Sequence, residues 1–247
     1  GGLGESDRSS FVAAVPDADM DQAADALMGA GYGSAGERCM AISVAVPVGE
    51  KTADILVEKL KPRVEALKIG PATDKDAQMG PIVSKVQRDK IVGYIDSGVE
   101  QGAKLVVDGR GFKLQGYENG FFVGGTLFDN VTPDMKIYRE EIFGPVLSVL
   151  TVESFDEAIA LANDTQYGLA ASIFTANVKK ALRGARAIRA GTVTVNSFGE
   201  GDISTPFGGY KCSGFGGRDN GIHAHDQYTE LKTIWVDLAD DADQAVA

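Results

Sequence analysis

The stretch CMAISVAVPVGEKTADILVEKLKPRVEAL, residues 39–67, decides the fold class. It begins at a cysteine with a mostly apolar run, 39–48, that predicts a strand. Residues 50–67 then predict an amphipathic helix, because Ile55, Leu56, Leu60 and Val64 recur at helical spacing. Pro62 is expected to kink or break this helix. A strand followed by a covering helix is the repeating unit of an α/β domain.

The rest of the chain repeats this alternation. Ser154 and Glu157 form a capping-box pattern at the start of one helix, and Gly102 is expected to stop another. Strands joined by helices cross over in the right-handed sense and pair in parallel, so we predict an α/β fold with a three-layer, open, largely parallel sheet. Helices are expected at 19–36, 84–103, 154–164 and 177–188, and strands at 104–109, 121–128, 144–152, 168–175 and 191–196.

The composition is that of an ordinary globular protein. The 247 residues are 44% hydrophobic and 24% charged, which is enough chain to bury a sizeable core. The formal net charge of −11 argues against a nucleic-acid partner, since such a surface needs clustered Lys and Arg. No apolar run approaches the ~20 residues of a membrane-spanning helix, so no membrane partner is expected.

The cysteine content indicates the redox compartment, and the two chain ends differ in composition from the rest of the chain. Two cysteines, Cys39 and Cys212, are too few for a disulfide framework or a four-thiolate zinc site, so we expect a reducing cytoplasm. Residues 1–15 begin with GGLGESDRSS, which lacks both Met and the features of a secretory signal, and we treat them as an atypical segment that need not be native. Residues 239–247 are an acidic tail that is expected to be poorly ordered.

Cys39 is the first candidate for chemistry. It lies in GSAGERCMA, residues 33–41, among small residues that would let a substrate approach the backbone. The neighbouring Arg38 and the backbone amides of a turn would favour the thiolate, and the Cys39 amide would help to stabilise an oxyanion. The alternative is an inert buried cysteine, and the local residues leave both interpretations open.

Two further segments contain candidate binding residues. In YREEIFGPVLSVL, residues 138–150, Glu140 and Glu141 lie at the mouth of an apolar strand, where a carboxylate can bind ribose hydroxyls; the alternative is a solvated acidic turn. The glycine-rich STPFGGYKCSGFGGRD, residues 204–219, fits no phosphate-binding pattern and predicts either a pocket-lining loop, with Phe207 against a ligand, or a surface turn.

The sequence HAH supplies both histidines of the chain, His223 and His225. On a strand the two side chains would point the same way, as in a metal pair, but no third ligand is evident and no metal is expected. A hydrolase in which one of them activates Cys39 is a rival enzyme class.

In this order, GSAGERCMA, EEIFGPVLSVL and PFGGYKCSGFG resemble the aldehyde dehydrogenase superfamily, from about Pro16 to Leu238. The resemblance implies that Cys39 attacks an aldehyde to give a thiohemiacetal, which loses hydride to NAD or NADP and leaves a thioacyl-enzyme. It also implies that Glu141 binds the nicotinamide ribose, that Phe143 lies beside it, and that the Phe207 loop lies near the active site. Arg38 would suit an acidic semialdehyde in the substrate pocket.

The finer similarity divides the chain. Up to about Leu150 it resembles methylmalonate-semialdehyde dehydrogenase, which passes the acyl group to coenzyme A rather than to water. From about Thr151 it resembles the branch that oxidises amine-derived aldehydes. The acceptor is therefore expected to be water or coenzyme A, and the aldehyde to be small.

The resemblance also divides the chain into parts. It implies a catalytic domain at 16–228 and a C-terminal assembly strand at 229–238, and hence a homo-oligomer. Family members are longer, and the dinucleotide-binding domain lies in the part that this chain does not match. Many members have a general-base glutamate before Leu-Gly-Gly; Glu5 lies at about the right separation but precedes Ser-Asp-Arg. A non-oxidising remnant, either a binding or assembly module or a weak thiol esterase, is the alternative function.

Overall fold

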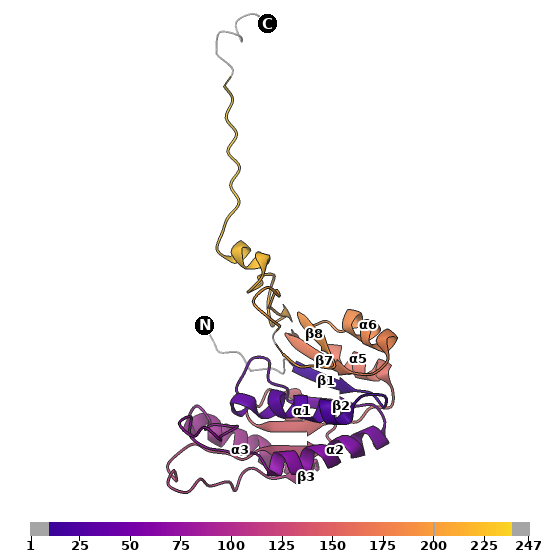
Figure 1. Cartoon of the computed structure of the whole chain (residues 1–247), viewed down its shortest axis with the longest axis vertical. Helices are drawn as coiled ribbons and strands as arrows, with labels where there is room; N and C mark the ends of the chain where they lie inside the picture. Colours follow the sequence, from indigo (N-terminus) through magenta and orange to yellow (C-terminus); the bar gives the residue numbers. More distant parts are fainter. Residues whose placement is uncertain (1–9, 200, 239–247) are drawn as a thin grey trace, which may run out of the picture.

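A computed structural model describes residues 10–199 and 201–238. Within them, seven strands form one sheet in the order β3-β4-β5-β2-β1-β7-β8 (Figure 1). Every neighbouring pair is parallel except β3 with β4. The strands are β1 (Ser10–Ala14), β2 (Val44–Pro47), β3 (Lys104–Val107), β4 (Thr126–Asp129), β5 (Val146–Val149), β7 (Ala170–Phe174) and β8 (Thr192–Val195), and a separate antiparallel pair joins β6 (Tyr167–Gly168) to β9 (Tyr210–Lys211).

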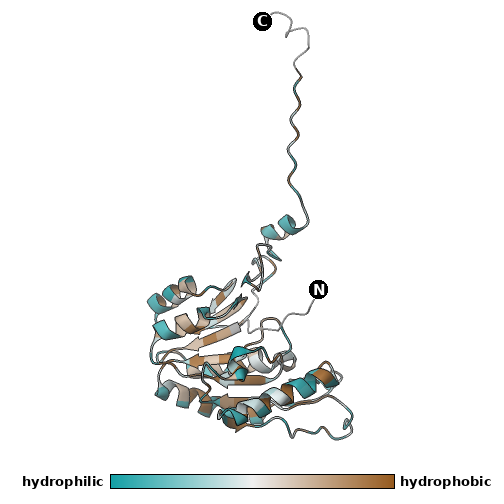
Figure 2. Ribbon diagram, turned by 180° about the vertical axis from the view of Figure 1, so that it is seen from behind, coloured by the Kyte–Doolittle hydropathy of each residue, from teal (hydrophilic) through white to brown (hydrophobic). Residues whose placement is uncertain are grey.

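Helices cover both faces of the sheet. The connection β1–α1–β2 runs along the sheet in one direction and β7–α6–β8 runs in the other, so right-handed crossovers put α1 and α6 on opposite faces. Figures 1 and 2 show these two sides of the three-layer α/β fold, which confirms the predicted class. The helices are α1 (Met20–Tyr32), α2 (Glu50–Glu65), α3 (Lys85–Glu100), α4 (Lys136–Arg139), α5 (Phe155–Asn163) and α6 (Val178–Ala187), with 3-10 turns η1 (Gly33–Gly36) and η2 (Ile222–Gln227).

The core lies between the central strands and the helices. All four residues of β2, β4 and β5 are buried, as expected for strands of a sheet that is covered on both faces. Brown, hydrophobic stretches run along the strands in Figure 2. Tyr32, at the end of α1, is buried, and its hydroxyl donates to the Thr126 carbonyl at 2.9 Å. This bond fixes the end of α1, from which the Cys39 segment begins.

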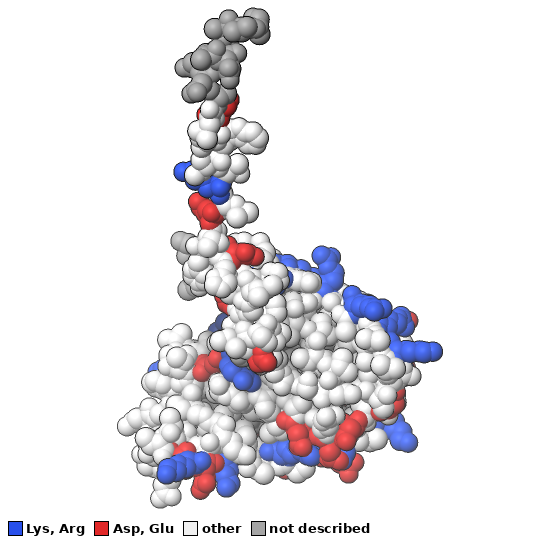
Figure 3. All heavy atoms as spheres, turned by 45° about the horizontal axis from the view of Figure 1, so that its top comes forward, with Lys and Arg blue, Asp and Glu red and all other residues white. Residues whose placement is uncertain are grey.

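Ion pairs hold α1 against α2. Lys59 and Arg63 of α2 pair with Asp21 at 2.8 and 3.0 Å, and Arg63 also pairs with Asp25 at 2.8 Å. All four side chains are partly exposed, so solvent screening keeps the contribution of each pair to stability small. Acidic and basic side chains are likewise mixed on the face that Figure 3 draws.

Two helices differ from what the sequence predicts. The predicted helix 19–36 ends at Tyr32, because Ser34, Ala35 and Gly36 have φ of 51°, 56° and 68°. Pro62 does not break the next helix, because α2 continues through it to Glu65. The helix continues because Leu56, Leu60 and Val64 are buried along one side, while the ring of Pro62 is exposed.

The ends of the chain also differ from expectation. The sheet begins before residue 16, since β1 pairs with β2 on one side and β7 on the other. Residues 229–238 form no strand within the described part of the chain; they extend away from the domain (Figure 1). Glu5 and the acidic tail 239–247 lie outside the described residues. Over 10–199 and 201–238, no helix has the length and apolar character of a membrane span.

Candidate active site

The Cys39 segment is a tight turn between α1 and β2. After the left-handed residues 34–36 the chain turns again, with the Ala41 N–H donating to the Arg38 carbonyl at 3.0 Å. Cys39 lies within this turn, is exposed and is not in a disulfide. Left-handed backbone at Ser34 and Ala35 costs energy, and such strain clusters at functional sites. Cys39 is therefore not the buried cysteine of the alternative interpretation.

Gly36 brings the Cys39 turn against the 138–150 segment. A Cβ on Gly36 would lie 2.2 Å from the carbonyl oxygen of Gly144, a distance that no side chain tolerates. Only glycine allows this approach, and the φ of 68° at Gly36 also favours glycine. Two of the segments singled out in the sequence thus touch through their glycines.

The third segment reaches the turn through apolar side chains. Met40, the residue after Cys39, is buried with Leu169 and Ala170, and Phe198 and Phe207 pack against this cluster. Phe207 is itself fixed by a two-way backbone pairing with Asp219, at 2.7 Å in each direction. The Phe207 loop therefore lies beside the residue that follows Cys39.

The three segments meet at the amino edge of the sheet. β2 and β5 are parallel neighbours with Val44 opposite Ser148, so the residues that precede them lie at the same edge. Cys39 precedes β2, and Glu141 and Phe143 precede β5. Ligands of open α/β sheets usually bind at the carboxyl ends of the strands, so this arrangement departs from that rule.

The Glu141–Phe143 segment is held by α3. Gln87 donates from Nε2 to the carbonyls of Ile142 and Phe143 at 3.1 and 2.9 Å, and Phe143 has a φ of 53°. The neighbouring Glu140 accepts from the Tyr94 hydroxyl at 2.7 Å. Burial and this carboxylate raise the pKa of Tyr94, so its hydroxyl stays protonated as a donor. Glu141 is half-buried at the same edge.

Glu37 and Arg38 are anchored in different directions. Arg38 donates from Nη2 to the Gly29 carbonyl of α1 at 2.8 Å, and Glu37 accepts from the Val83 N–H at 3.0 Å. Burial raises the pKa of the Glu37 carboxyl, and the Val83 N–H opposes that rise. No local sequence pattern singles out Glu37 or Gln87, since their partners lie 46 to 56 residues away.

The two histidines do not lie on a strand. His223 and His225 lie in the 3-10 turn η2, so the alternation that would direct two strand side chains the same way does not apply to them. Both are exposed, and His223 lies 3.8 Å from Asp226. No cluster of three metal-ligating side chains occurs among the described residues. Cys212 is exposed in the loop after β9.

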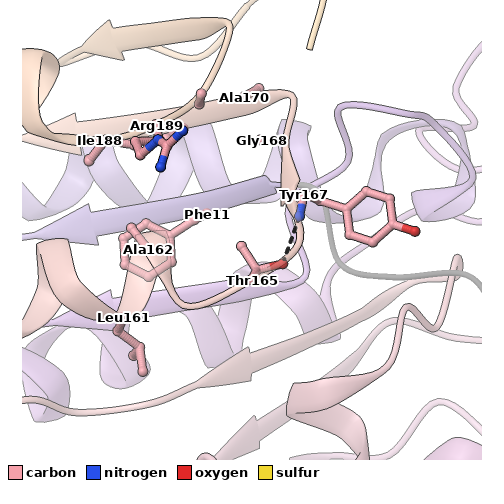
Figure 4. A pocket seen from close by; sticks show the side chains of 11 residues that line it. Phe11, Leu161, Ala162, Thr165, Tyr167, Gly168, Ala170, Ile188 and Arg189 are labelled. Carbon is pink, nitrogen blue, oxygen red and sulfur yellow. Dashed lines mark hydrogen bonds between the residues drawn. The ribbon is translucent and has the colours of Figure 1, made fainter. Parts of the chain in front are cut away.

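A small pocket lies near this edge (Figure 4). It is lined by Phe11 of β1, by Leu161 and Ala162 of α5, and by the segments around Tyr167 and Arg189. Its volume of about 20 Å³ is the room of roughly one water molecule, so it is too small for an organic substrate. The pocket shares Ala170 with the Met40 cluster, so it adjoins the residues that pack against Met40.

Comparison with known families agrees with the ordered segments. The profile of the aldehyde dehydrogenase family matches residues 8–234. The chain belongs to the aldehyde dehydrogenase family. The match includes β1, which supports its place in the domain, and it extends over all three segments.

Relatives within the family represent both branches of the resemblance. The chain is 52% identical over 230 residues to a malonate-semialdehyde dehydrogenase of Pseudomonas aeruginosa, an alignment of 89% of this chain and 45% of that protein. The methylmalonate-semialdehyde dehydrogenase of Oceanimonas doudoroffii superposes with a TM-score of 0.90 at 42% identity, covering 96% of this chain and 49% of that one. The betaine aldehyde dehydrogenase of Staphylococcus aureus in complex with NAD+ gives 0.85 at 35% identity, covering 90% and 44%. The chain thus spans less than half the length of these aldehyde dehydrogenases.

Proposed function

We propose that this chain is the catalytic part of an NAD(P)-dependent aldehyde dehydrogenase that oxidises a small aldehyde or semialdehyde, with Cys39 as its nucleophile. One observation carries the proposal: the Cys39 turn meets the Glu141–Phe143 segment and the Phe207 loop at one edge of the sheet. The similarity to semialdehyde dehydrogenases, and to a betaine aldehyde dehydrogenase in complex with NAD+, supports it.

The chemistry assigned to Cys39 needs an exposed thiolate. Its Sγ attacks the aldehyde carbon, and the carbonyl π electrons move to oxygen to give the thiohemiacetal anion. Backbone N–H groups of the turn would stabilise that oxyanion. Collapse of the anion breaks the carbon–hydrogen bond and leaves a thioester on Cys39; NAD(P)+ supplies the hydride acceptor. Water or the thiol of coenzyme A then attacks the thioester carbon and releases Cys39.

The remaining residues are assigned to binding. Glu141 is a half-buried acceptor at the edge that carries Cys39, which fits ribose hydroxyls, and the aromatic Phe143 next to it would cover the ribose. Phe207 would line the substrate side through its packing near Met40. Arg38 has five N–H donors and uses one of its nitrogens on Gly29, so others can meet the carboxylate of a semialdehyde.

The test is NADH formation by this chain with NAD+ and a panel of semialdehydes. We expect Cys39→Ala to abolish it, and Cys212→Ala and the double variant His223→Ala/His225→Ala to leave it unchanged. Loss of activity in the double histidine variant would instead favour a Cys–His hydrolase. Absence of NADH from folded wild-type chain would mean that this chain is not a dehydrogenase by itself.

The second candidate is a non-oxidising remnant that retains a reactive cysteine. It is favoured by one observation, that Cys39 is exposed and not in a disulfide, so an ester can reach its thiol. Such a chain would still be acylated at Cys39 by an activated ester such as p-nitrophenyl acetate, because acylation needs no hydride acceptor. Acylation without NADH formation would identify this weak thiol esterase.

A further inference from the structure

Glu37 lies two residues before Cys39 and is bound to a distant part of the chain. Its Oε2 accepts the Val83 backbone N–H at 3.0 Å, across 46 residues of sequence. Val83 directly precedes Ser84, which caps α3 by accepting from the Gln87 N–H. Gln87 in turn holds the carbonyls of Ile142 and Phe143. The Glu37 carboxylate therefore joins the Cys39 turn to the start of the helix that holds the Phe143 segment.

The burial of Glu37 is energetically unfavourable, which indicates that its contact with Val83 has a structural role. Glu37 Oε1 is buried and has no hydrogen-bond partner among the described residues, and the same is true of Arg38 Nε. A buried polar atom without a partner loses its hydration without compensation, and each such atom in a native structure needs an explanation. The charged form of Glu37 is further disfavoured by burial, which raises its pKa.

The anchors around Cys39 act from different sides. Arg38 is tied to α1 through Gly29, Gly36 rests on Gly144, and Glu37 is tied to Val83. The first two contacts tie the turn to α1 and to the segment before β5. The Glu37 carboxylate adds a side-chain hydrogen bond to the residue that precedes the cap of α3. Because one of its oxygens binds a backbone amide and the other is buried, it is not placed to exchange a proton with substrate.

We propose that Glu37 is a positioning residue for Cys39: its carboxylate holds the Val83 backbone against the cysteine turn and so keeps the thiol and the adjoining backbone amides in the geometry for acylation. This inference rests on the proposed role of Cys39 as nucleophile. It concerns how the turn is held, and it does not depend on NAD or on the identity of the aldehyde.

The test compares Glu37→Gln with Glu37→Ala in a Cys212→Ser background. The Gln variant keeps an oxygen that can accept the Val83 N–H, and the Ala variant does not. Single-turnover acylation of Cys39 by p-nitrophenyl acetate is followed by intact mass well above the ordinary thiol pKa. At that pH the thiol is almost fully ionised, so removing the charge of Glu37 does not change the fraction of thiolate. We expect Glu37→Ala to be slowed about 10-fold and Glu37→Gln to stay within about 3-fold of wild type.

Amide hydrogen exchange at Val83 is the second measurement, and it does not depend on catalysis. Its protection should fall in Glu37→Ala and persist in Glu37→Gln. Glu118→Ala is the matched control, since Glu118 also accepts a backbone N–H, from Gly116, in a separate loop. Glu118→Ala should leave both readouts unchanged and so shows whether loss of any such carboxylate slows acylation.

The outcomes separate the two proposals. If the wild-type chain is not acylated at Cys39, the nucleophile assignment fails, whatever happens at Val83. If the wild-type chain is acylated and folded Glu37→Ala reacts at the same rate, the positioning role is overturned. Equal slowing in Glu37→Gln and Glu37→Ala would also overturn it, because the restored acceptor would then have had no effect.

Discussion

At the scale of single residues, Gly36 controls how closely two segments of the site approach. The Cβ of an alanine there would meet the Gly144 carbonyl at 2.2 Å, and the φ of 68° is unfavourable for any side chain. Gly36→Ala therefore adds a steric clash to backbone strain. We expect it to lower the free energy of unfolding by about 3 kcal/mol or more, measured by urea denaturation.

Gly102→Ala is the matched control for this prediction. Gly102 has a φ of 91° at the end of α3, and a Cβ there would meet no atom within 4 Å. It tests backbone strain alone and should cost only about 1 kcal/mol. Equal losses in the two variants would show that the approach to Gly144 does not matter for stability.

The segments of the candidate site were easier to single out from the sequence than their arrangement. Cys39, Glu141 and Phe207 lie in motifs that are recognisable by residue type and order. Contacts such as that between Glu37 and Val83 depend on the tertiary approach of distant segments, which no local pattern encodes. The position of the site at the amino edge of the sheet also needed the strand order.

At the scale of elements, α2 shows how packing overrides local propensity. Proline inside a helix removes one hydrogen bond and crowds the preceding turn, yet α2 continues to Glu65. Its buried side chains Leu56, Leu60 and Val64 hold it on the sheet from both sides of Pro62. Local propensity is a weak guide where a helix has such a buried face.

Replacing Pro62 should therefore stabilise the fold. Pro62→Ala restores the N–H that can donate to the Glu58 carbonyl, and we expect a gain of about 1–3 kcal/mol in urea denaturation followed by circular dichroism. Pro71→Ala is the control, because Pro71 lies in a turn, where its carbonyl accepts the Asp74 N–H at 2.9 Å. It should lose up to about 1 kcal/mol through a freer unfolded chain. A Pro62→Ala variant no more stable than wild type would contradict this account.

The strand β1 was not predicted, because its apolar run is short and the residues around it give no start or stop signal. β1 is five residues long, and its apolar residues are buried in the middle of the sheet, so it lacks the alternation that marks a half-exposed strand. Longer segments such as α3 and α5 were predicted with their Ser84 and Ser154 starts close to those in the structure. The helices α3 and α5 were predictable because they are longer and begin after a capping serine, whereas β1 is short and has no such signal.

At the scale of the whole molecule, the exposed apolar side chains gather beyond the domain. Within the described part of the segment 229–238, Leu231, Ile234 and Trp235 are 105%, 74% and 90% exposed, and the segment makes no strand pairing. Contiguous exposed apolar side chains of this kind mark protein–protein contact sites. The strand β8 is the last in the sheet order, so its outer edge has no neighbouring strand within the described residues. Such an edge has backbone groups that another chain can pair with.

We therefore expect the chain to self-associate through residues 229–238, in line with the homo-oligomer that the sequence resemblance implies. Trp235 is the single tryptophan of the chain, so burial of the segment should shift its fluorescence emission to shorter wavelength as protein concentration rises. Leu231→Asp/Ile234→Asp keeps Trp235 and should reduce both this shift and the mass measured by light scattering. Leu182→Asp, on the exposed face of α6, is the control, because it adds a charge to an apolar site outside the segment. A monomeric mass and a water-exposed emission at every concentration would show that the segment does not mediate assembly of this chain.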